Sequence, residues 1–321
     1  MYGLNLHWGP GMGNETNMET AFRTRRGPDF LCIGMPKCGT STLQVLLRDR
    51  TVIYVSPLKE IKFFARDRIG YDGGLRNFLF SKHWAARQER RAVAQIAKQV
   101  ATGKEDMKRL NWALSFVTAR RDLDWYLDLF PRNRISGDIS PCYHMLNDDE
   151  VQHVKSQLPH LKIVILLRNP FDQLWSHCRM STRAVKIEDE VAFYREKIDY
   201  QMDICPRYVD LVERWQKVYG PKNVIVDYLE SLSSNPGEVL NRIVSFIDPP
   251  MGAVNRIAAL DATPKVFKGK KMSMPDETCE LLRDAALQRL EGFERINEGL
   301  ARHWRSEVGQ RCSVGSRLTN L

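Results

Sequence analysis

The stretch DFLCIGMPKCGTSTLQVLLRDR, residues 29–50, decides the fold of this chain. Its first six residues form a short apolar run that ends in glycine, which is typical of a buried strand. In residues 40–50 three leucines recur on one face, so this segment is predicted to be a helix. A strand, a turn containing glycine and a helix in this order indicate the beginning of an α/β domain.

The turn between them, GMPKCGTST at residues 34–42, has the composition of an anion-binding loop. Glycines let the backbone turn tightly, and successive N–H groups at the N-terminus of a helix point toward a bound phosphate. Lys37 adds a positive charge, and hydroxyl donors follow it at Thr40, Ser41 and Thr42. Taken alone, this loop is equally compatible with an ordinary strand-to-helix turn.

Two glycines of this loop, Gly34 and Gly39, have the spacing of the ATPase pattern G-x-x-x-x-G-K-[ST]. Position 40 is Thr where that pattern has lysine, and the only lysine of the loop is Lys37. A P-loop kinase or nucleotide hydrolase would therefore lack the lysine that binds the β- and γ-phosphates. This alternative also needs an acidic strand end for Mg²⁺, whereas the apolar segment 161–168 ends in arginine.

Four further apolar segments are predicted to be strands: 51–56, 134–140, 161–168 and 222–230. The segment LKIVILL is apolar throughout, as in a parallel strand that helices cover on both faces. Helices are predicted between and after the strands, at 86–101, 109–129, 148–157, 170–182, 188–219, 236–247 and 275–304. This alternation predicts one α/β domain at 28–305, with a P-loop-like central parallel sheet of about five strands and helices on both faces. A flexible arm (1–27) and a flexible tail (306–321) are expected to flank it.

Bulk composition limits the function only broadly. Of 321 residues, 43% are hydrophobic and 27% charged, and the net charge of +9 attracts anionic ligands or polyanions without choosing among them. There is no apolar run long enough to span a membrane, and the first residues lack the apolar centre of a signal peptide. The seven scattered cysteines lack metal-site spacing and indicate mainly reduced thiols. A cytoplasmic location is expected, with the Golgi lumen as the alternative if an anchor once preceded the chain.

A second motif, LKIVILLRNPFDQLWSHCRM, occupies residues 161–180. Arg168 follows the carboxyl end of a predicted strand, which is where open α/β sheets bind ligands. Its planar guanidinium group is suited to a phosphate. Ser176 comes six residues after Pro170, so its hydroxyl can point toward the same anion from the first turns of a helix.

Together these two segments resemble the PAPS-dependent sulfotransferases, in which P-K-[CSA]-G-T-[ST] is characteristic. PAPS is 3′-phosphoadenosine 5′-phosphosulfate, and PAP is its product. The resemblance implies that the 5′-phosphosulfate is bound by Lys37, Cys38, Gly39, Thr40, Ser41 and Thr42. It implies that Arg168 and Ser176 bind the 3′-phosphate. A third match, to the family's K-G-[RK]-K loop that closes over the nucleotide, comprises Lys268, Gly269, Lys270 and Lys271. The likeness extends over about residues 29–304.

The segment SPLKEIKFF, residues 56–64, is similar to the segment after the second strand in the glycan sulfotransferases. That similarity implies that Glu60 removes the acceptor proton. Lys37 is expected to protonate or screen the leaving group, and Lys59 to contact donor or acceptor. His144 is the reserve candidate for the base, because the cytosolic branch of the family uses a histidine. Nearby aromatic side chains would raise the pKa of Glu60, whereas its flanking lysines would lower it.

Two segments bear on the acceptor. In GDISPCYHML (137–146) the pair Gly137-Asp138 replaces the Glu-Lys pair of several heparan-type relatives, and Asp138 could bind the acceptor or cap the turn. The segment LDWYLDLFP (123–131) resembles one in the glycan enzymes, and its helical spacing predicts that most of its aromatic side chains belong to the core. Three tryptophans are possible sugar platforms, although buried packing is the other interpretation: Trp8, Trp84 and Trp112.

The expected reaction is an in-line transfer of a sulfuryl group from PAPS to a hydroxyl, less readily an amine, of a carbohydrate or small-molecule acceptor. Lysines and backbone N–H groups can supply the electrostatics, so no metal is expected to be required. A non-enzymatic basic module that binds polyanions is the remaining alternative. Zinc-finger spacing and RNP-type sequence are absent, and no nucleic-acid partner is expected.

Overall fold

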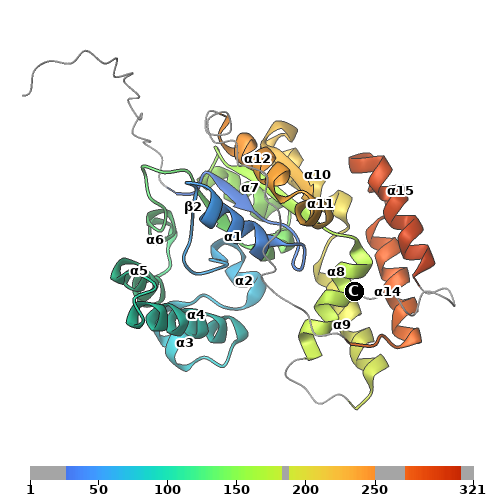
Figure 1. Ribbon diagram of the computed structural model, residues 1–321, viewed down its shortest axis with the longest axis horizontal. Coiled ribbons are helices and arrows are strands. Elements are labelled where there is room, and N and C mark those ends of the chain that lie inside the picture. Colours follow the sequence, from blue (N-terminus) through green and yellow to red (C-terminus); the bar gives the residue numbers. More distant parts are fainter. Residues whose placement is uncertain (1–26, 183–187, 250–271, 312–321) are drawn as a thin grey trace, which may run out of the picture.

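The protein, a computed structural model, is built around one central sheet (Figure 1), and the structure describes residues 27–182, 188–249 and 272–311. All neighbouring strands are parallel, in the order β2-β3-β1-β4-β5. The strands are β1 (Phe30–Cys32), β2 (Tyr54–Val55), β3 (Ser136–Ile139), β4 (Lys162–Leu167) and β5 (Val224–Tyr228). Each lies inside a segment predicted to be a strand, so the predicted five-stranded α/β architecture is confirmed.

Helices surround the sheet. The first half of the chain forms α1 (Thr40–Arg50), α2 (Arg66–Ile69), α3 (Gly74–Phe80), α4 (Trp84–Ala101), α5 (Met107–Thr118), α6 (Leu123–Asp128) and α7 (Asp148–Gln157). The second half forms α8 (Pro170–Ser181), α9 (Glu190–Ile204), α10 (Tyr208–Tyr219), α11 (Leu229–Ser234), α12 (Pro236–Ile247), α14 (Asp276–Arg289) and α15 (Glu294–Gln310). In Figure 1, α3, α4 and α5 form one group beside the sheet, and α8, α9, α14 and α15 form another. None of these described helices combines the length and apolarity that a membrane span requires.

Three segments predicted as single helices are each two helices: 109–129, 188–219 and 275–304. In the first, the side chain of Asp122 accepts a hydrogen bond from the Trp125 N–H and thereby begins a new helix. In the second, Pro206 lies in the break, and proline lacks the N–H that a continuing helix needs. In the third, Gly292 has a φ of 75°, which is left-handed and favours glycine.

The position of β1 places the loop that follows it at the centre of the sheet. β1 pairs with β3 on one side and with β4 on the other, and Phe30 lies opposite Gly137. A Cβ atom at Gly137 would lie only 2.1 Å from the Phe30 ring. Gly137 therefore leaves the space that this ring fills. The carboxyl ends of the strands share one edge, and in such sheets ligands bind at that edge.

Replacing Gly137 by alanine should destabilise the protein, because the added methyl group would collide with Phe30. The expected loss is about 1–3 kcal/mol of unfolding free energy, measured by urea denaturation. Gly309→Ala is the matched control, since a Cβ at Gly309 in α15 meets no atom within 4 Å. The control should be neutral or slightly stabilising. Equal stability of the two variants would contradict the packing argument.

Candidate active site

The loop after β1 has a strained backbone that leads into a helix. Lys37 has a φ of 69° and Gly39 a φ of 90°. Positive φ is uncommon for a residue other than glycine, and such strain is concentrated at functional sites. α1 begins directly after Gly39, without a side-chain cap and without an acidic residue in its first turn. Its first N–H groups are therefore suited to an anion.

The side chains of this loop differ in what they can offer to a ligand. Cys38 and Thr40 are buried, so their contribution would come from backbone N–H groups. Burial also raises the pKa of the Cys38 thiol, against the opposing charges of Arg168 and Arg289, so the thiol is neutral. Ser41 and Thr42 are partly exposed. The Nζ of Lys37 lies 3.7 Å from the sulfur of Met180 at the end of α8.

The loop after β2 carries three charged residues in contact. Lys59 Nζ lies 3.2 Å from Glu60 Oε1, and Lys62 Nζ lies 3.6 Å from Glu60 Oε2. Both Glu60 and Lys62 have a φ of 63°, which is again unusual for residues other than glycine. Lys59 also donates a hydrogen bond to the hydroxyl of Ser41. This lysine thus links Glu60 to the loop after β1.

The two lysines determine the ionisation of Glu60. Burial raises the pKa of this carboxyl, but the charges and hydrogen bonds of Lys62 and Lys59 together outweigh burial. The net result is a pKa below the ordinary value of 4.5. Glu60 is therefore an ionised carboxylate at neutral pH, which is the form that can accept a proton.

A buried carboxylate in β3 supports the segment that carries Glu60. Asp138 accepts hydrogen bonds from Ser140 Oγ at 2.6 Å, Tyr143 OH at 2.6 Å and Tyr126 OH at 3.1 Å. Ser140 Oγ in turn accepts from the backbone N–H of Lys62 at 3.0 Å. Asp138 is thus fully engaged inside the protein, and of its two predicted roles the geometry favours the structural one. Sequence reasoning missed the part of Ser140, because a serine before a proline carries no signal of its distant partner.

The loop after β4 lies against the first loop. Arg168 is partly exposed, and its guanidinium lies 3.9 Å from Asp172 in α8. Gln173 of the same helix donates a hydrogen bond to the Pro36 carbonyl at 3.1 Å. Ser176 is partly exposed, further along α8. Gln173 therefore joins α8, the helix that follows Arg168 and carries Ser176, to the loop after β1.

His144 is placed in the core. Its Nδ1 lies 2.6 Å from the Pro141 carbonyl oxygen and its Nε2 lies 3.1 Å from the sulfur of Cys205. Burial lowers the pKa of His144 to about 4. Because both ring nitrogens have partners inside the protein, the geometry disfavours His144 as the base. Two other predicted groups lie outside the described residues: Trp8 and the basic segment 268–271.

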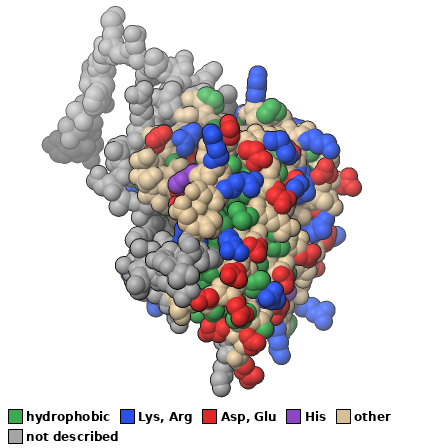
Figure 2. Space-filling model, turned by 90° about the vertical axis from the view of Figure 1, so that its right-hand side faces the viewer, with side chains coloured by type: hydrophobic (Ala, Val, Ile, Leu, Met, Phe, Trp, Pro, Cys, Tyr) green, Lys and Arg blue, Asp and Glu red, His purple; other side chains and the backbone are tan. Residues whose placement is uncertain are grey.

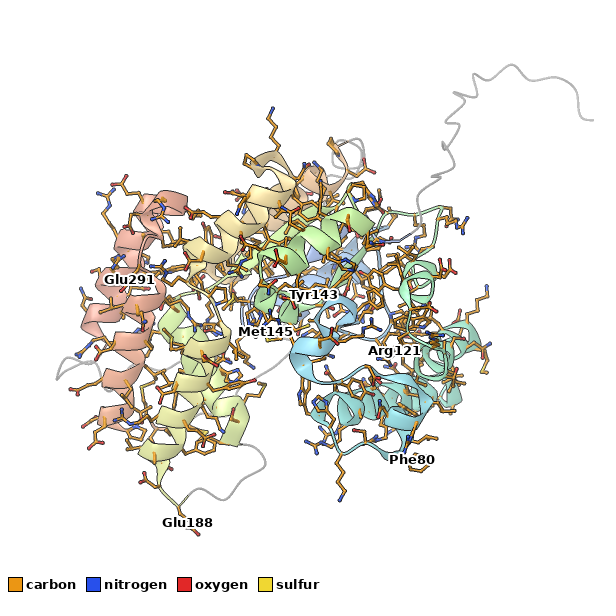
Figure 3. The ribbon with its side chains drawn as sticks, turned by 180° about the vertical axis from the view of Figure 1, so that it is seen from behind. Phe80, Arg121, Tyr143, Met145, Glu188 and Glu291 are labelled. Atoms are coloured by element: carbon orange, nitrogen blue, oxygen red, sulfur yellow. The ribbon has the colours of Figure 1, made fainter. Side chains whose placement is uncertain are left out.

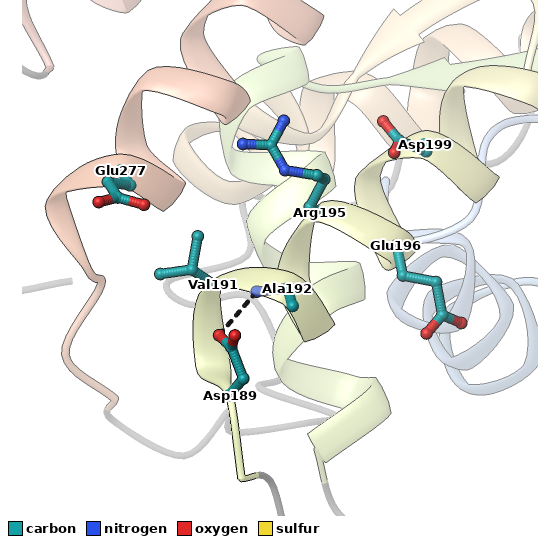
Figure 4. Close-up of a pocket in the computed structure, with 7 residues that line it drawn as sticks. All are labelled: Asp189, Val191, Ala192, Arg195, Glu196, Asp199 and Glu277. Atoms are coloured by element: carbon teal, nitrogen blue, oxygen red, sulfur yellow. Dashed lines mark hydrogen bonds between the residues drawn. The ribbon is translucent and has the colours of Figure 1, made fainter.

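Two surface hollows lie away from the residues after β1. One, of about 570 Å³ between α9 and α14, is lined by Asp189, Glu196, Asp199, Glu277, Arg195, Val191 and Ala192 (Figure 4). Its mainly acidic walls do not suit a phosphate. The other, of about 760 Å³, lies beside Phe63 and Phe64 and has both acidic and basic walls. Within the described ranges, no group of three or more His, Cys, Asp and Glu could hold a metal ion.

The cysteines differ in part from expectation. Cys279 is disulfide-bonded, so it is an exception to the interpretation of the cysteines as mainly reduced thiols. The other described cysteines are free: Cys32, Cys38, Cys142, Cys178 and Cys205. Disulfides persist mainly in oxidising compartments, so this bond does not support the expected cytoplasmic location.

Charges on the surface are mixed where they can be compared. Figure 2 shows the face formed by α14 and α15, and basic and acidic side chains alternate across it. Opposite charges are also paired between helices, such as Arg295 of α15 with Glu213 of α10 at 2.9 Å. A continuous basic stripe, as expected for a polyanion-binding module, is not seen on this face.

Comparison with known proteins gives the same answer as the sheet edge. The sequence model of the family described as "Sulfotransferase domain" matches residues 27–311. Carbohydrate sulfotransferase 15 of Homo sapiens is 23% identical in an alignment of 267 residues, and the match covers 71% of this chain and 45% of that protein. The bifunctional heparan sulfate N-deacetylase/N-sulfotransferase of Drosophila melanogaster is 25% identical in an alignment of 157 residues, and the match covers 40% of this chain and 15% of that protein. The chain thus spans less than half the length of the curated relatives it matches.

A solved structure shares the fold. The sulfotransferase from Alicyclobacillus acidocaldarius superimposes with a TM-score of 0.55 at 21% sequence identity, covering 86% of this chain and 98% of that one. The family match includes every described residue of the sheet edge, and the kinase alternative is not favoured. The chain therefore belongs to the sulfotransferase family of transferase enzymes.

Proposed function

We propose that this protein transfers a sulfuryl group from PAPS to a hydroxyl group of its acceptor. The observation that carries this proposal is the contact of Lys59 with both Glu60 and Ser41. It joins an ionised carboxylate, suited to remove a proton, to a loop suited to hold a phosphosulfate. The resemblance to sulfotransferases, whose donor is PAPS, supports the choice of nucleotide.

Each residue has a distinct task in the proposed reaction. Glu60 accepts the proton of the acceptor hydroxyl, whose oxygen forms the new bond to sulfur. The bond between sulfur and the bridging phosphate oxygen breaks, and Lys37 with the N–H groups at the start of α1 stabilises the charge that develops on PAP. Arg168 and Ser176 hold the 3′-phosphate, and Lys59 keeps the donor loop and the base in register.

We propose a carbohydrate as the acceptor, with Trp84 as the surface on which its ring stacks. Trp84 is 46% exposed at the start of α4, and its ring lies 5.4 Å from the ammonium of Lys62. Lys62 in turn contacts Glu60 and Gln88 Oε1. An exposed indole that contacts the same lysine as the base gives a pyranose ring an apolar face to contact while its hydroxyl reaches Glu60. The names of the curated relatives refer to carbohydrate and heparan sulfate, which supports a carbohydrate as the acceptor.

The proposed cellular compartment of the protein follows from its cysteines. The disulfide at Cys279 favours the Golgi lumen, the alternative considered from the sequence, over the cytoplasm.

A small-molecule alcohol remains the second acceptor class, and screening of both classes decides between them.

PAP should bind to the protein in the absence of Mg²⁺, and more tightly than ATP–Mg²⁺ does. Arg168→Ala and Lys37→Ala should each weaken PAP about 10- to 100-fold, because each removes a hydrogen bond between charged groups. Isothermal titration calorimetry measures both effects. Lys217→Ala, which removes a lysine whose side chain is 72% exposed, is the control and should leave binding unchanged. Preferential binding of ATP–Mg²⁺ would falsify the choice of nucleotide.

Glu60→Gln should lower turnover about 10²- to 10⁴-fold while PAP affinity stays close to that of the wild type. Lys62→Met should raise the pKa of Glu60, because burial is then opposed by one lysine fewer. Since the base acts in its ionised form, the acidic limb of the pH profile of kcat/KM should move to higher pH in this variant. Full turnover of Glu60→Gln with normal PAP binding would remove Glu60 as the base.

Trp84→Ala should raise KM for the acceptor about 3- to 10-fold, the value of one aromatic contact, with unchanged PAP affinity. The acceptor is the best substrate from a panel of unsulfated polysaccharides and small alcohols assayed with labelled PAPS. Phe80→Ala, which truncates a side chain that is 78% exposed in α3, is the matched control. If both variants keep the wild-type KM, the acceptor does not stack on Trp84.

A further inference from the structure

Arg289, near the end of α14, is a buried cation that the proposed reaction does not use. Its side chain has no solvent exposure, and it is among the largest fully buried side chains of the described residues. A guanidinium group stays protonated in proteins, so burial cannot neutralise it. The positive charge is therefore fixed in the interior, next to α8 and α9.

The partners of Arg289 in the described ranges are all neutral. One terminal nitrogen donates to Gln173 Oε1 at 2.8 Å, and the other donates to the Gln201 carbonyl at 2.8 Å and lies 3.3 Å from the Met202 sulfur. Its Nε has no hydrogen-bond partner there. No described carboxylate lies within ion-pair distance. By contrast, Arg121 (labelled in Figure 3), the second buried arginine of the described residues, is paired with Glu89 at 3.0 Å.

A short chain of contacts joins Arg289 to the donor loop. Gln173 accepts from Arg289 through its Oε1 and donates through its Nε2 to the Pro36 carbonyl at 3.1 Å. Pro36 directly precedes Lys37. The path of two hydrogen bonds and one amide group is on the order of 8 Å long, which is shorter than the roughly 10 Å over which salt screens charges in solution. The charge of Arg289 is therefore close enough to act on the residues of this loop.

An unpaired buried charge is costly unless something compensates it. We propose that Arg289 is a buried countercharge for the nucleotide, a positioning residue that strengthens binding of the phosphate groups through Gln173 and the loop without touching the ligand. This inference rests on the proposed function, because it assigns the compensating anion to the donor site. It adds a cation that no sequence pattern singles out and that lies far from Arg168 in the sequence.

Calorimetry on the full chain tests the role of the charge. Arg289→Met removes the charge while keeping a long side chain and should weaken PAP about 10- to 30-fold, the value of one charge at this range in a protein interior. Arg289→Lys keeps the charge and should stay within about threefold of the wild type. 5′-AMP, which carries fewer charges, should lose less affinity than PAP in Arg289→Met. Arg283→Met, which removes a partly exposed arginine from the same helix, should bind PAP like the wild type.

Several outcomes would overturn the proposal. Unchanged PAP affinity of Arg289→Met, or equal losses for PAP and 5′-AMP, would leave Arg289 as a structural link only. So would equal losses in the lysine and methionine variants. If Arg289→Met does not fold, Gln173→Glu and Gln173→Met replace it: both remove the donor to Pro36, but only the glutamate pairs the charge of Arg289. Gln173→Glu should then bind PAP more weakly than Gln173→Met does. A wild-type protein that binds no PAP would instead refute the proposed donor.

Discussion

The buried carboxylate of Asp138 is the interaction on which the candidate site depends. Its oxygens accept hydrogen bonds from the hydroxyl groups of three residues. Ser140 directly follows β3, Tyr143 lies in the turn after it, and Tyr126 belongs to α6. Ser140 then holds the backbone of Lys62. A hydrogen-bonded network of this kind is stable only when every member is satisfied, so it specifies one position for the segment that carries Glu60. Rigid support from the sheet thus reaches an irregular loop.

In the proposed reaction the sheet edge holds two anions, the carboxylate of Glu60 and the phosphosulfate of the donor. Glu60 lies between Lys59 and Lys62, which keep its carboxylate ionised in spite of burial. The loop after β1 offers Lys37 and backbone N–H groups to a phosphate, with Arg168 beside it. Lys59 contacts Glu60 and Ser41, so in the proposed complex its positive charge would reduce the repulsion between the carboxylate and the phosphosulfate.

Much of the fold and part of the site could be predicted from residues that are close in the sequence. The strand and helix around Gly39 and the strand before Arg168 follow from local apolar patterns, and the structure confirms them. Contacts between distant residues could not be predicted in this way. Gln173 reaches Pro36 and Arg289 across intervals of 137 and 116 positions, and no local pattern records such a pairing. The breaks within long helices were missed because tertiary packing, not helical periodicity, decides where a helix ends.

Left-handed backbone at Lys37, Glu60 and Lys62 has a consequence for how the protein can be improved or can evolve. Glycine would relieve the backbone at each position but would remove a charged group: Lys37 and Glu60 act in the proposed reaction, and Lys62 helps to keep Glu60 ionised. Selection for thermal stability alone would therefore favour changes that impair the proposed reaction at these three sites. The surrounding fold has to supply the stability that this loop geometry costs, which makes the chemistry of the site and the robustness of the domain opposing demands.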